Sequence, residues 1–226
     1  MHIDIISDVI CPWCFIGKRR LERALALRPE IAVDIAWRPF QLNPDMPREG
    51  MDRKAYLAAK FGAAAPAERI YANVAAAGAS VDIPFAFERI RRTPNTRDAH
   101  RLIRRAGAEG RADATVEALF RSHFVEARDI GDIGVLAEIG GAVGLDRAET
   151  RRWLASPAAV DEVITEDRSA RRLGINAVPC FVFAGQYAVS GAQDPEFFLP
   201  VFDLVTQGSD ARDQRAKGGR SLVSDT

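Results

Sequence analysis

Two cysteines near the N-terminus, Cys11 and Cys14, have the residue type and spacing for redox chemistry. Thiols three positions apart can close a disulfide across a small loop, and the thiolate is the form that attacks another disulfide. An apolar run over residues 2–9 predicts a strand before the motif, and a helical pattern over residues 14–27 follows it. Free backbone N–H groups at a helix N-terminus stabilise negative charge, so we predict that Cys11 is the nucleophile. Cys14, further into the helix, then resolves the mixed disulfide.

The residues beside the two thiols fit this role. Pro12 suits the first turn of a helix, because its missing N–H would have no partner there. Trp13 offers a flat apolar surface next to the reactive sulfur. A second proline, Pro179, stands at the entry of a later apolar segment after Val178. The basic run at residues 18–20 is predicted to lie on a solvated helix face.

Few other residues could bind a metal: Cys180, His2, His100 and His123. A structural zinc site needs about four ligands, and none of these residues forms a second pair at ligand spacing, so we predict no metal site. Cys180 is predicted to be a small buried residue, with a role as a third redox thiol as the alternative. His100 is predicted to have a structural role and to be satisfied by a hydrogen bond. His123 falls on the apolar stripe of Val116, Leu119 and Phe120, so it is predicted to pack in the core.

The elements around the motif predict an α/β protein with a mixed central sheet. A crossover helix makes the first two strands parallel, and a late hairpin adds antiparallel strands. Gly174 is predicted to end the helix before that hairpin. Periodicity predicts strands over residues 31–40, 177–183 and 187–189, and helices over residues 158–173 and 195–206.

The middle of the chain differs from both ends. Residues 51–157 are rich in alanine, arginine and glutamate and carry almost no strand pattern, so we predict a large all-helical insertion. Residues 1–50 and 158–206 then form one domain around it. Residues 207–226 are polar and aperiodic, and we predict that they form a disordered tail.

Composition excludes several classes of protein. The chain has 31 basic and 31 acidic side chains among 226 residues, so it has no basic field for nucleic acid. Its sequence holds no stretch of about 20 apolar residues that could cross a membrane. It has only three cysteines, too few for a disulfide scaffold. Its first residues lack the pattern of a secretory signal, so we expect a cytoplasmic protein.

Five segments carry a resemblance to a known family. They are residues 8–14 with Gly17, 37–44, 95–101, 174–179 and 190–193. Together they resemble the DsbA-like branch of the thioredoxin superfamily, and within it the FrnE-like cytosolic oxidoreductases. The resemblance covers about residues 2–206 and implies a thioredoxin fold for the domain that surrounds the insertion.

The resemblance also implies a site and its substrates. It implies a cis peptide bond at Val178–Pro179, facing the two thiols, with the backbone of Val178 binding an extended substrate. It implies substrates that are proteins or small thiols, glutathione as a co-substrate, and no cofactor besides the redox disulfide. A homodimer is compatible with it. The residues expected to contact substrate are Pro12, Trp13, Phe40, Asn95, Val178 and Pro179.

Two other functions stay open on the sequence. One is a glutathione-dependent isomerase or transferase, similar to 2-hydroxychromene-2-carboxylate isomerase or the kappa-class glutathione transferases. Those relatives typically place serine at the position of Cys11 and lack the second cysteine, so the intact pair favours redox chemistry. The other is a non-catalytic metal-binding or chaperone module that uses Trp13 and the surrounding groove.

Overall fold

The computed structural model describes residues 1–62 and 64–218, and a four-stranded mixed sheet lies at its centre. Strand β1 pairs in parallel with β2 and antiparallel with β5, and β6 completes the hairpin, giving the order β2-β1-β5-β6. The crossover from β1 to β2 is helix α1. The bounds are β1 (His2–Ser7), α1 (Pro12–Ala26), β2 (Asp34–Pro39), β5 (Cys180–Phe183) and β6 (Tyr187–Ser190). The predicted mixed sheet is confirmed.

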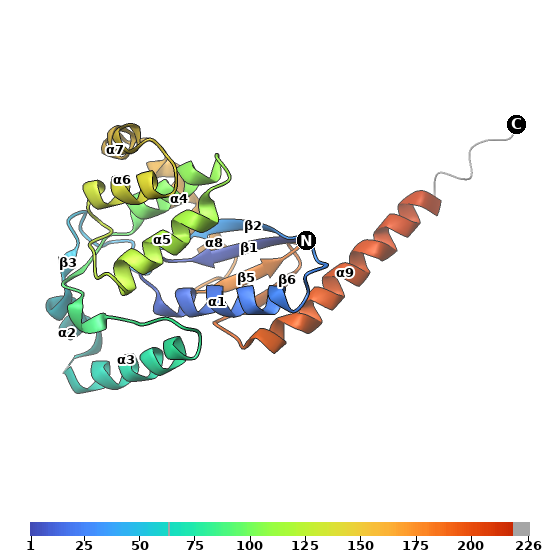
Figure 1. Ribbon diagram of the computed structural model, residues 1–226, viewed down its shortest axis with the longest axis horizontal. Helices are drawn as coiled ribbons and strands as arrows, with labels where there is room; N and C mark the ends of the chain where they lie inside the picture. Colours follow the sequence, from blue (N-terminus) through green and yellow to red (C-terminus); the bar gives the residue numbers. More distant parts are fainter. Residues whose placement is uncertain (63, 219–226) are drawn as a thin grey trace, which may run out of the picture.

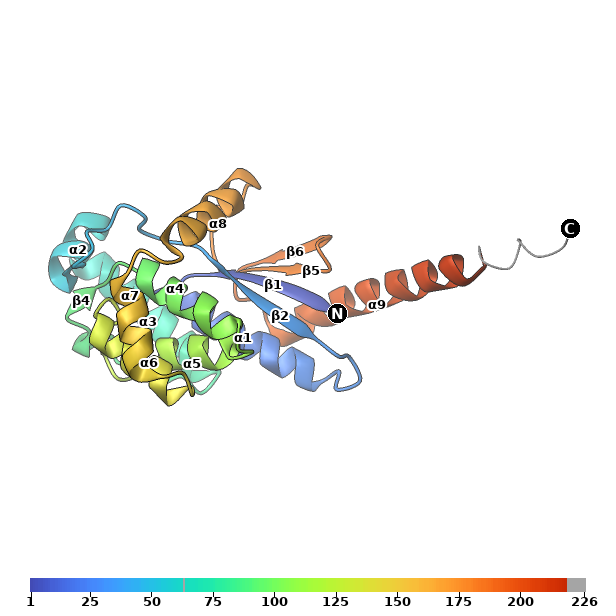
Figure 2. The same cartoon turned by 90° about the horizontal axis from the view of Figure 1, so that it is seen from above.

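Helices cover both faces of this sheet. Helices α1 and α9 (Pro195–Gly218) lie on one face, and α8 (Val160–Arg172) lies on the other, as Figures 1 and 2 show. Alternation along the strands explains the division, because successive side chains point to opposite faces. Ile5 and Phe181 join the core under α1 and α9, whereas Ile6 packs on the other face.

The insertion is built mainly of helices. They are α2 (Arg53–Phe61), α3 (Ala64–Ala79), the short η1 (Phe87–Arg89), α4 (Arg97–Gly107), α5 (Ala112–Phe124), α6 (Ile133–Ala142) and α7 (Arg147–Ala155). It also contains a two-stranded ladder that the sequence analysis did not predict. Strands β3 (Met51–Asp52) and β4 (Arg92–Thr93) pair antiparallel. Strands of two residues are too short to show any periodicity, which is why the insertion was predicted to be all-helical.

Aromatic packing fixes α1 against the insertion. Phe15, in the first turn of α1, stacks on Phe120 of α5 with ring centroids 4.9 Å apart and an interplanar angle of 10°. Phe124 and Phe85 pack around the same ring. Aromatic pairs of this kind contribute about 0.5–1.5 kcal/mol beyond the burial of their area. The cysteine motif is therefore carried by a helix whose first turn is anchored in the insertion.

Arg101 of α4 organises the far side of the insertion. Its side chain is 1% exposed and donates hydrogen bonds to the carboxylate of Asp98 and to the carbonyls of Trp153, Leu154, Ser156 and Ala158. These carbonyls belong to the end of α7 and to the turn after it, where backbone acceptors have no partner within the helix. Residues 95–101, one of the segments behind the family resemblance, thus include a buried arginine that ties two helices together.

Of the two predicted helix ends, one is confirmed and the other is wrong. Gly174 has a φ of +84° directly after α8, as predicted for a helix end. The predicted disordered tail from Gln207 is wrong over its first part, because α9 continues to Gly218 and projects beyond the rest of the molecule (Figure 1). The rest of that tail, 219–226, lies outside the described residues. Among the described helices, none is long and apolar enough to span a bilayer.

Candidate active site

Cys11 occupies the N-cap of α1. Its backbone is extended, with φ −92° and ψ 112°, and Pro12 takes the first helical position. The first turn of α1 contains no acidic residue that would oppose an anion there. The Cys11 thiol donates a hydrogen bond to the carbonyl oxygen of Val178 at 3.6 Å. The sulfur predicted to be the nucleophile therefore sits at a helix N-terminus and touches the backbone predicted to bind substrate.

Cys14 lies deeper, directly against Cys11. It is 1% exposed, compared with 5% for Cys11, and the two side chains are in hydrogen-bond contact. Burial raises the pKa of the Cys14 thiol well above its usual range, and the neighbouring Cys11 raises it further. The nearby Ser7 side chain and Asp8 backbone lower the pKa and so act in the opposite direction. The geometry thus pairs an outer thiol with an inner thiol that holds its proton tightly.

A tight contact between α1 and the proline loop fixes the width of the site. The Val178–Pro179 peptide bond is cis. An added Cβ on Gly17 would lie 2.9 Å from Cγ of Pro179, closer than real Cβ contacts allow, and 3.1 Å from Cζ of Phe181, which is tighter than most of them. The carbonyl of Pro179 accepts a hydrogen bond from the N–H of Gly191 at 2.8 Å. Glycine at position 17 therefore lets the proline loop lie flat against the helix that carries the thiols.

The predicted substrate-contacting residues divide into two groups. Trp13 is 39% exposed, and Pro12 and Val178 are half-buried, so these three lie at the surface around Cys11. Phe40 and Asn95 are buried. The guanidinium carbon of Arg171 lies 4.2 Å from the centre of the Phe40 ring. Asn95 donates a hydrogen bond to the carbonyl of Met46 and accepts one from the N–H of Arg97, the first residue of α4. A direct contact between either of these buried side chains and a substrate stays a prediction.

Cys180 lies away from the pair. It aligns with Ile6 in the sheet register and packs with Ile6, Phe40 and Ala170 on the face that α8 covers. Cys11 and Cys14 belong to a different core cluster, at the start of α1. All three cysteines are free thiols. The position of Cys180 is that of a small buried residue. Neither Cys11 nor Cys14 lies beside it to act as a redox partner.

Three residues beneath the motif were not predicted as functional. Ser7 and Asp8 are polar residues near the end of the predicted strand over residues 2–9, and they are only 4% and 0% exposed. Asp8 Oδ1 lies 3.3 Å from Nε2 of His100, whose side chain is 4% exposed, and Asp8 Oδ2 accepts a hydrogen bond from the N–H of Leu42. The pairing joins residues 92 positions apart. No local sequence signal indicates it, although a polar pair beside a redox motif was visible at residues 7 and 8.

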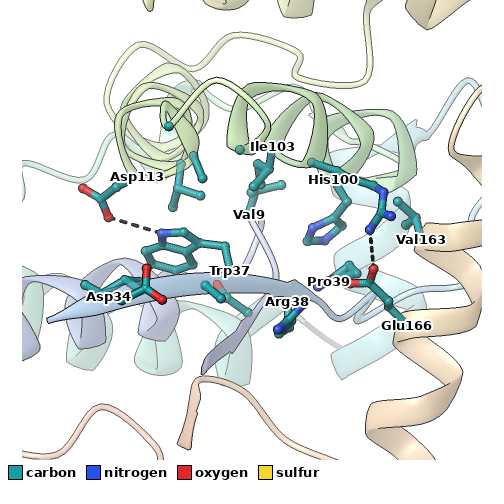
Figure 3. A pocket seen from close by; sticks show the side chains of 18 of the residues that line it. Val9, Asp34, Trp37, Arg38, Pro39, His100, Ile103, Asp113, Val163 and Glu166 are labelled. Carbon is teal, nitrogen blue, oxygen red and sulfur yellow. Dashed lines mark hydrogen bonds and ion pairs between the residues drawn. The ribbon is translucent and has the colours of Figure 1, made fainter. Parts of the chain in front are cut away.

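A cavity of about 510 Å³ lies between β2 and helices α4, α5 and α8 (Figure 3). We call it the β2 cavity, because residues 33–39 form one side of it. Ser7, Val9 and His100 form its wall nearest the cysteine motif. The cavity therefore reaches from the edge of the sheet to the residues beneath Cys14.

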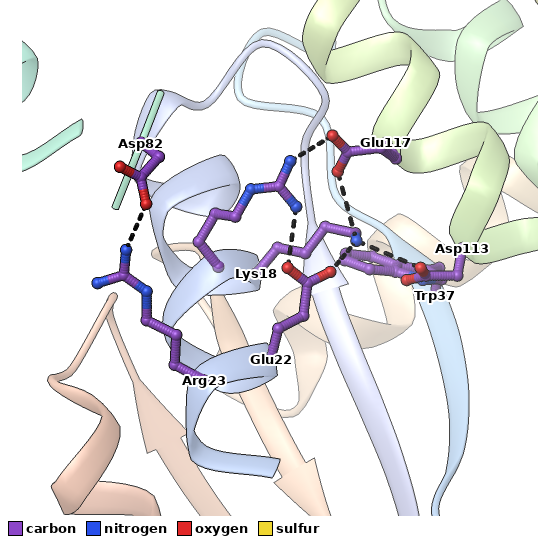
Figure 4. Close-up of polar contacts among 8 residues, drawn as sticks. Lys18, Glu22, Arg23, Trp37, Asp82, Asp113 and Glu117 are labelled. Carbon is purple, nitrogen blue, oxygen red and sulfur yellow. Dashed lines mark hydrogen bonds and ion pairs between the residues drawn. The ribbon is translucent and has the colours of Figure 1, made fainter. Parts of the chain in front are cut away.

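The basic run at residues 18–20 is not a solvated face as predicted. Lys18 is 4% exposed and lies one turn beyond Cys14, with its ammonium 3.2 Å from Asp113 and 3.4 Å from Glu117 of α5 and also bonded to Glu22 (Figure 4). Burial alone would lower the pKa of Lys18, but the attraction of these carboxylates outweighs it and raises that pKa. The cluster is a second link between α1 and the insertion.

Metal ligands do not cluster in the described part of the chain. No group of three or more histidine, cysteine, aspartate or glutamate side chains there is arranged to hold an ion. His123 is buried against Phe124, with ring centroids 4.7 Å apart. Its burial and the charge of Arg53 lower its pKa to about 3, although a backbone hydrogen bond at Arg128 opposes this. The predicted packing of His123 is confirmed, and the low pKa means that its side chain is neutral near pH 7.

This arrangement of thiols, proline loop and helical insertion matches a known family. The model of the DSBA-like thioredoxin domain matches residues 2–202. The chain belongs to that family. A structure from Streptomyces coelicolor, described as a probable DsbA oxidoreductase, is 34% identical, with a TM-score of 0.81 over 100% of this chain and 94% of that one. YwbO of Bacillus subtilis, which is uncharacterised, is 26% identical over 204 residues, or 88% of this chain and 94% of YwbO.

More distant structures share the fold of this DSBA-like domain. The cytosolic disulfide reductase DsbM of Pseudomonas aeruginosa, solved with GSH, is 18% identical, with a TM-score of 0.63 over 95% of this chain and 100% of DsbM. A 2-hydroxychromene-2-carboxylate isomerase is also 18% identical, with a TM-score of 0.65 over 99% of this chain and 100% of the isomerase. The family match over residues 2–202 and the 34% identical structure confirm the superfamily that the sequence resemblance implies.

Proposed function

We propose that this DSBA-like protein is a thiol–disulfide oxidoreductase that works through Cys11 and Cys14. The observation that carries the proposal is the placement of two adjacent thiols, one at the helix N-cap against the Val178 carbonyl and the other buried beneath it. An isomerase that binds glutathione needs only one group at the position of Cys11. A second thiol placed directly against the first favours redox chemistry, because it can resolve a mixed disulfide.

In the proposed reaction, the Cys11 thiolate attacks a substrate disulfide and forms a mixed disulfide, and one substrate thiolate leaves. Cys14 then loses its proton and attacks the sulfur of Cys11, which releases the second substrate thiolate and leaves a Cys11–Cys14 disulfide. Two electrons pass from the protein dithiol to the substrate. Reduced glutathione would restore the dithiol, and the reverse sequence would oxidise a dithiol substrate.

We propose proteins or small disulfides as substrates, glutathione as the co-substrate and a cytoplasmic setting. The structure of DsbM with GSH, on the same fold, supports glutathione. Around Cys11 the surface is formed by Trp13 and the half-buried Pro12 and Val178, which suits an extended apolar segment more than a charged one. The backbone of Val178 would then bind the segment through its polar groups.

Insulin reduction with glutathione as electron donor tests the proposal. We expect turnover by the wild type, no turnover by Cys11→Ser, and a trapped mixed disulfide in Cys14→Ser that mass spectrometry detects. Cys180→Ala should keep full activity, and its loss would instead support a third redox thiol. Full activity of Cys11→Ser would refute the proposal.

The same variants separate redox chemistry from glutathione-dependent isomerisation. Turnover of 2-hydroxychromene-2-carboxylate with glutathione that persists in Cys14→Ser, in a protein that does not reduce insulin, would establish the isomerase. That substrate is the matched probe, because the isomerase shares the fold over the whole chain.

A further inference from the structure

The β2 cavity runs along the edge of the sheet. Seven consecutive residues of this edge, 33–39, line it. Side chains along a strand alternate between the two faces, so an unbroken run of lining residues means that the cavity follows the strand edge itself. Among the described strands, β2 pairs only with β1, so its outer N–H and C=O groups face this space. Backbone groups of this kind need hydrogen-bond partners, which favours water as the content of the cavity.

The inner end of the β2 cavity lies one side chain away from Cys14, the group that the proposed reaction must deprotonate. Ser7 lines the cavity, and its side chain lies near enough to the Cys14 thiol to lower the pKa of that thiol. Among the residues that the structure describes, the buried Ser7 Oγ makes no hydrogen bond. Cys14 itself is 1% exposed and has no cavity contact of its own. Ser7 is therefore the side chain that lies between the buried thiol and the cavity.

A buried acid–base pair lies at the same end. His100 lines the β2 cavity (Figure 3). Its Nε2 lies 3.3 Å from Asp8 Oδ1. Within the described residues, neither of these two atoms makes a hydrogen bond. Unsatisfied polar atoms at full burial are costly, so their retention calls for a function or a bound water.

We propose that Ser7 and the His100–Asp8 pair carry the Cys14 proton from the buried thiol to water in the β2 cavity. The inference rests on the proposed redox function. It adds the path by which Cys14 loses its proton when it attacks Cys11. Cys14 attacks Cys11 while its proton passes to the Ser7 hydroxyl, and the hydroxyl proton passes through cavity water to His100. The imidazolium of His100, held beside Asp8, then releases the proton to solvent. The released substrate thiolate takes up a proton from solvent.

Other charged groups face the β2 cavity from each element around it, and most are already paired. Asp34 contacts His2, Arg38 contacts Asp4, Arg104 contacts Glu166, and Asp113 contacts Lys18. These pairs are more exposed than His100, because at least one partner in each is over 40% exposed. His100 is thus the buried titratable group among them.

The test measures the two steps separately with oxidised glutathione as the probe. Attack by Cys11 is followed in a Cys14→Ala background, where the glutathione mixed disulfide accumulates. Resolution is followed in the complete chain by acid quench and mass spectrometry between pH 5.5 and 9. The variants are Ser7→Ala and His100→Gln, with Ser7→Thr as the conservative variant that keeps the hydroxyl and Glu166→Gln as the control at the exposed end of the cavity.

We expect resolution at pH 7 to slow at least tenfold in Ser7→Ala and in His100→Gln, since positioned proton transfer contributes about 10²–10⁴ in rate. The deficit should shrink as pH rises, because hydroxide then removes the proton. Attack by Cys11 should stay within twofold of the wild-type rate. Ser7→Thr should recover most of the loss, and Glu166→Gln should resolve normally.

Two results would overturn the inference. One is resolution in both variants at the wild-type rate with the wild-type pH profile. The other is an equal slowing of attack and resolution with an unchanged profile, which would mean that the residues only hold the structure. A wild-type protein that never forms the mixed disulfide would refute the proposed function itself, so the two failures are distinguishable.

Discussion

Gly17→Ala is expected to damage the site without removing any of its chemical groups. The new Cβ would meet Cγ of Pro179 at 2.9 Å and Cζ of Phe181 at 3.1 Å. An ordinary carbon–carbon contact is about 3.5–4.0 Å, so the proline ring must retreat by roughly 0.6–1.1 Å. The contact between the Cys11 thiol and the Val178 carbonyl, at 3.6 Å, depends on this loop.

The size of the effect follows from two opposing contributions. Overpacking of a close contact costs about 1–3 kcal/mol. Replacing glycine by alanine inside a helix raises the free energy of unfolding by about 1 kcal/mol, because alanine has the higher helix propensity. The free energy of unfolding should therefore fall by roughly 0–2 kcal/mol, a small change. Activity should fall further, by about ten- to a hundredfold in kcat/KM, because a misplacement near 1 Å can cost 10²-fold.

Insulin reduction and thermal unfolding measure the two effects. Gly141→Ala is the matched control, since its Cβ would lie 3.4 Å from Cβ of Arg147, in ordinary contact, within helix α6. The control should unfold at the same or a higher temperature and keep its activity. A Gly17→Ala protein with wild-type turnover would show that the proline loop does not need its present distance from α1.

Three further predictions concern stability. Arg101→Met should cost about 3–5 kcal/mol in urea unfolding, because it leaves Asp98 and several carbonyls buried without their donor. His123→Phe should flatten the pH dependence of stability: between pH 6.5 and about 3 only the unfolded chain binds this proton, so wild-type stability falls by roughly 1.4 kcal/mol per pH unit as pH drops well below 6.5. Lys18→Met should cost about 1–2 kcal/mol, less at high salt, because the carboxylates around it are partly exposed.

Each of these three stability predictions can be contradicted by a specific result. Arg104→Met, at an exposed ion pair, should cost under about 1 kcal/mol, and an equal loss in both arginine variants would contradict the special role of Arg101. For His123, parallel stability curves of variant and wild type across pH 4–7 would show that the imidazole is protonated inside the fold. For Lys18, a loss that is independent of salt would point to packing of its methylenes instead of its charge.

The strongest sequence patterns predicted the frame of the site. An apolar run, proline at the first helical position and Gly174 each have a local physical meaning, so β1, α1 and the end of α8 follow from them. The thiols of Cys11 and Cys14 then had to meet at a helix start. Trp13 at the surface also follows, because the motif must face solvent to reach substrate.

What the sequence did not reveal depends on distant contacts. Lys18 is buried because three carboxylates surround it, two of them from α5, and a basic run read locally is expected to be solvated. The pair of Asp8 and His100 joins two segments that only the folded chain brings together. The last helix extends through residues that lack amphipathic periodicity, which is the signal that predicts helices.

The contacts that join α1 to the insertion also bear on which substrates could take part in the proposed reaction. Phe15 and Lys18 both lie within one turn of Cys14, and both are held by α5. The insertion therefore cannot swing aside like a hinged cover without pulling on the helix that positions the thiols. We expect the opening around Cys11 to keep a constant width. Extended segments and small disulfides should then reach Cys11, whereas disulfides inside compact folded proteins should not react.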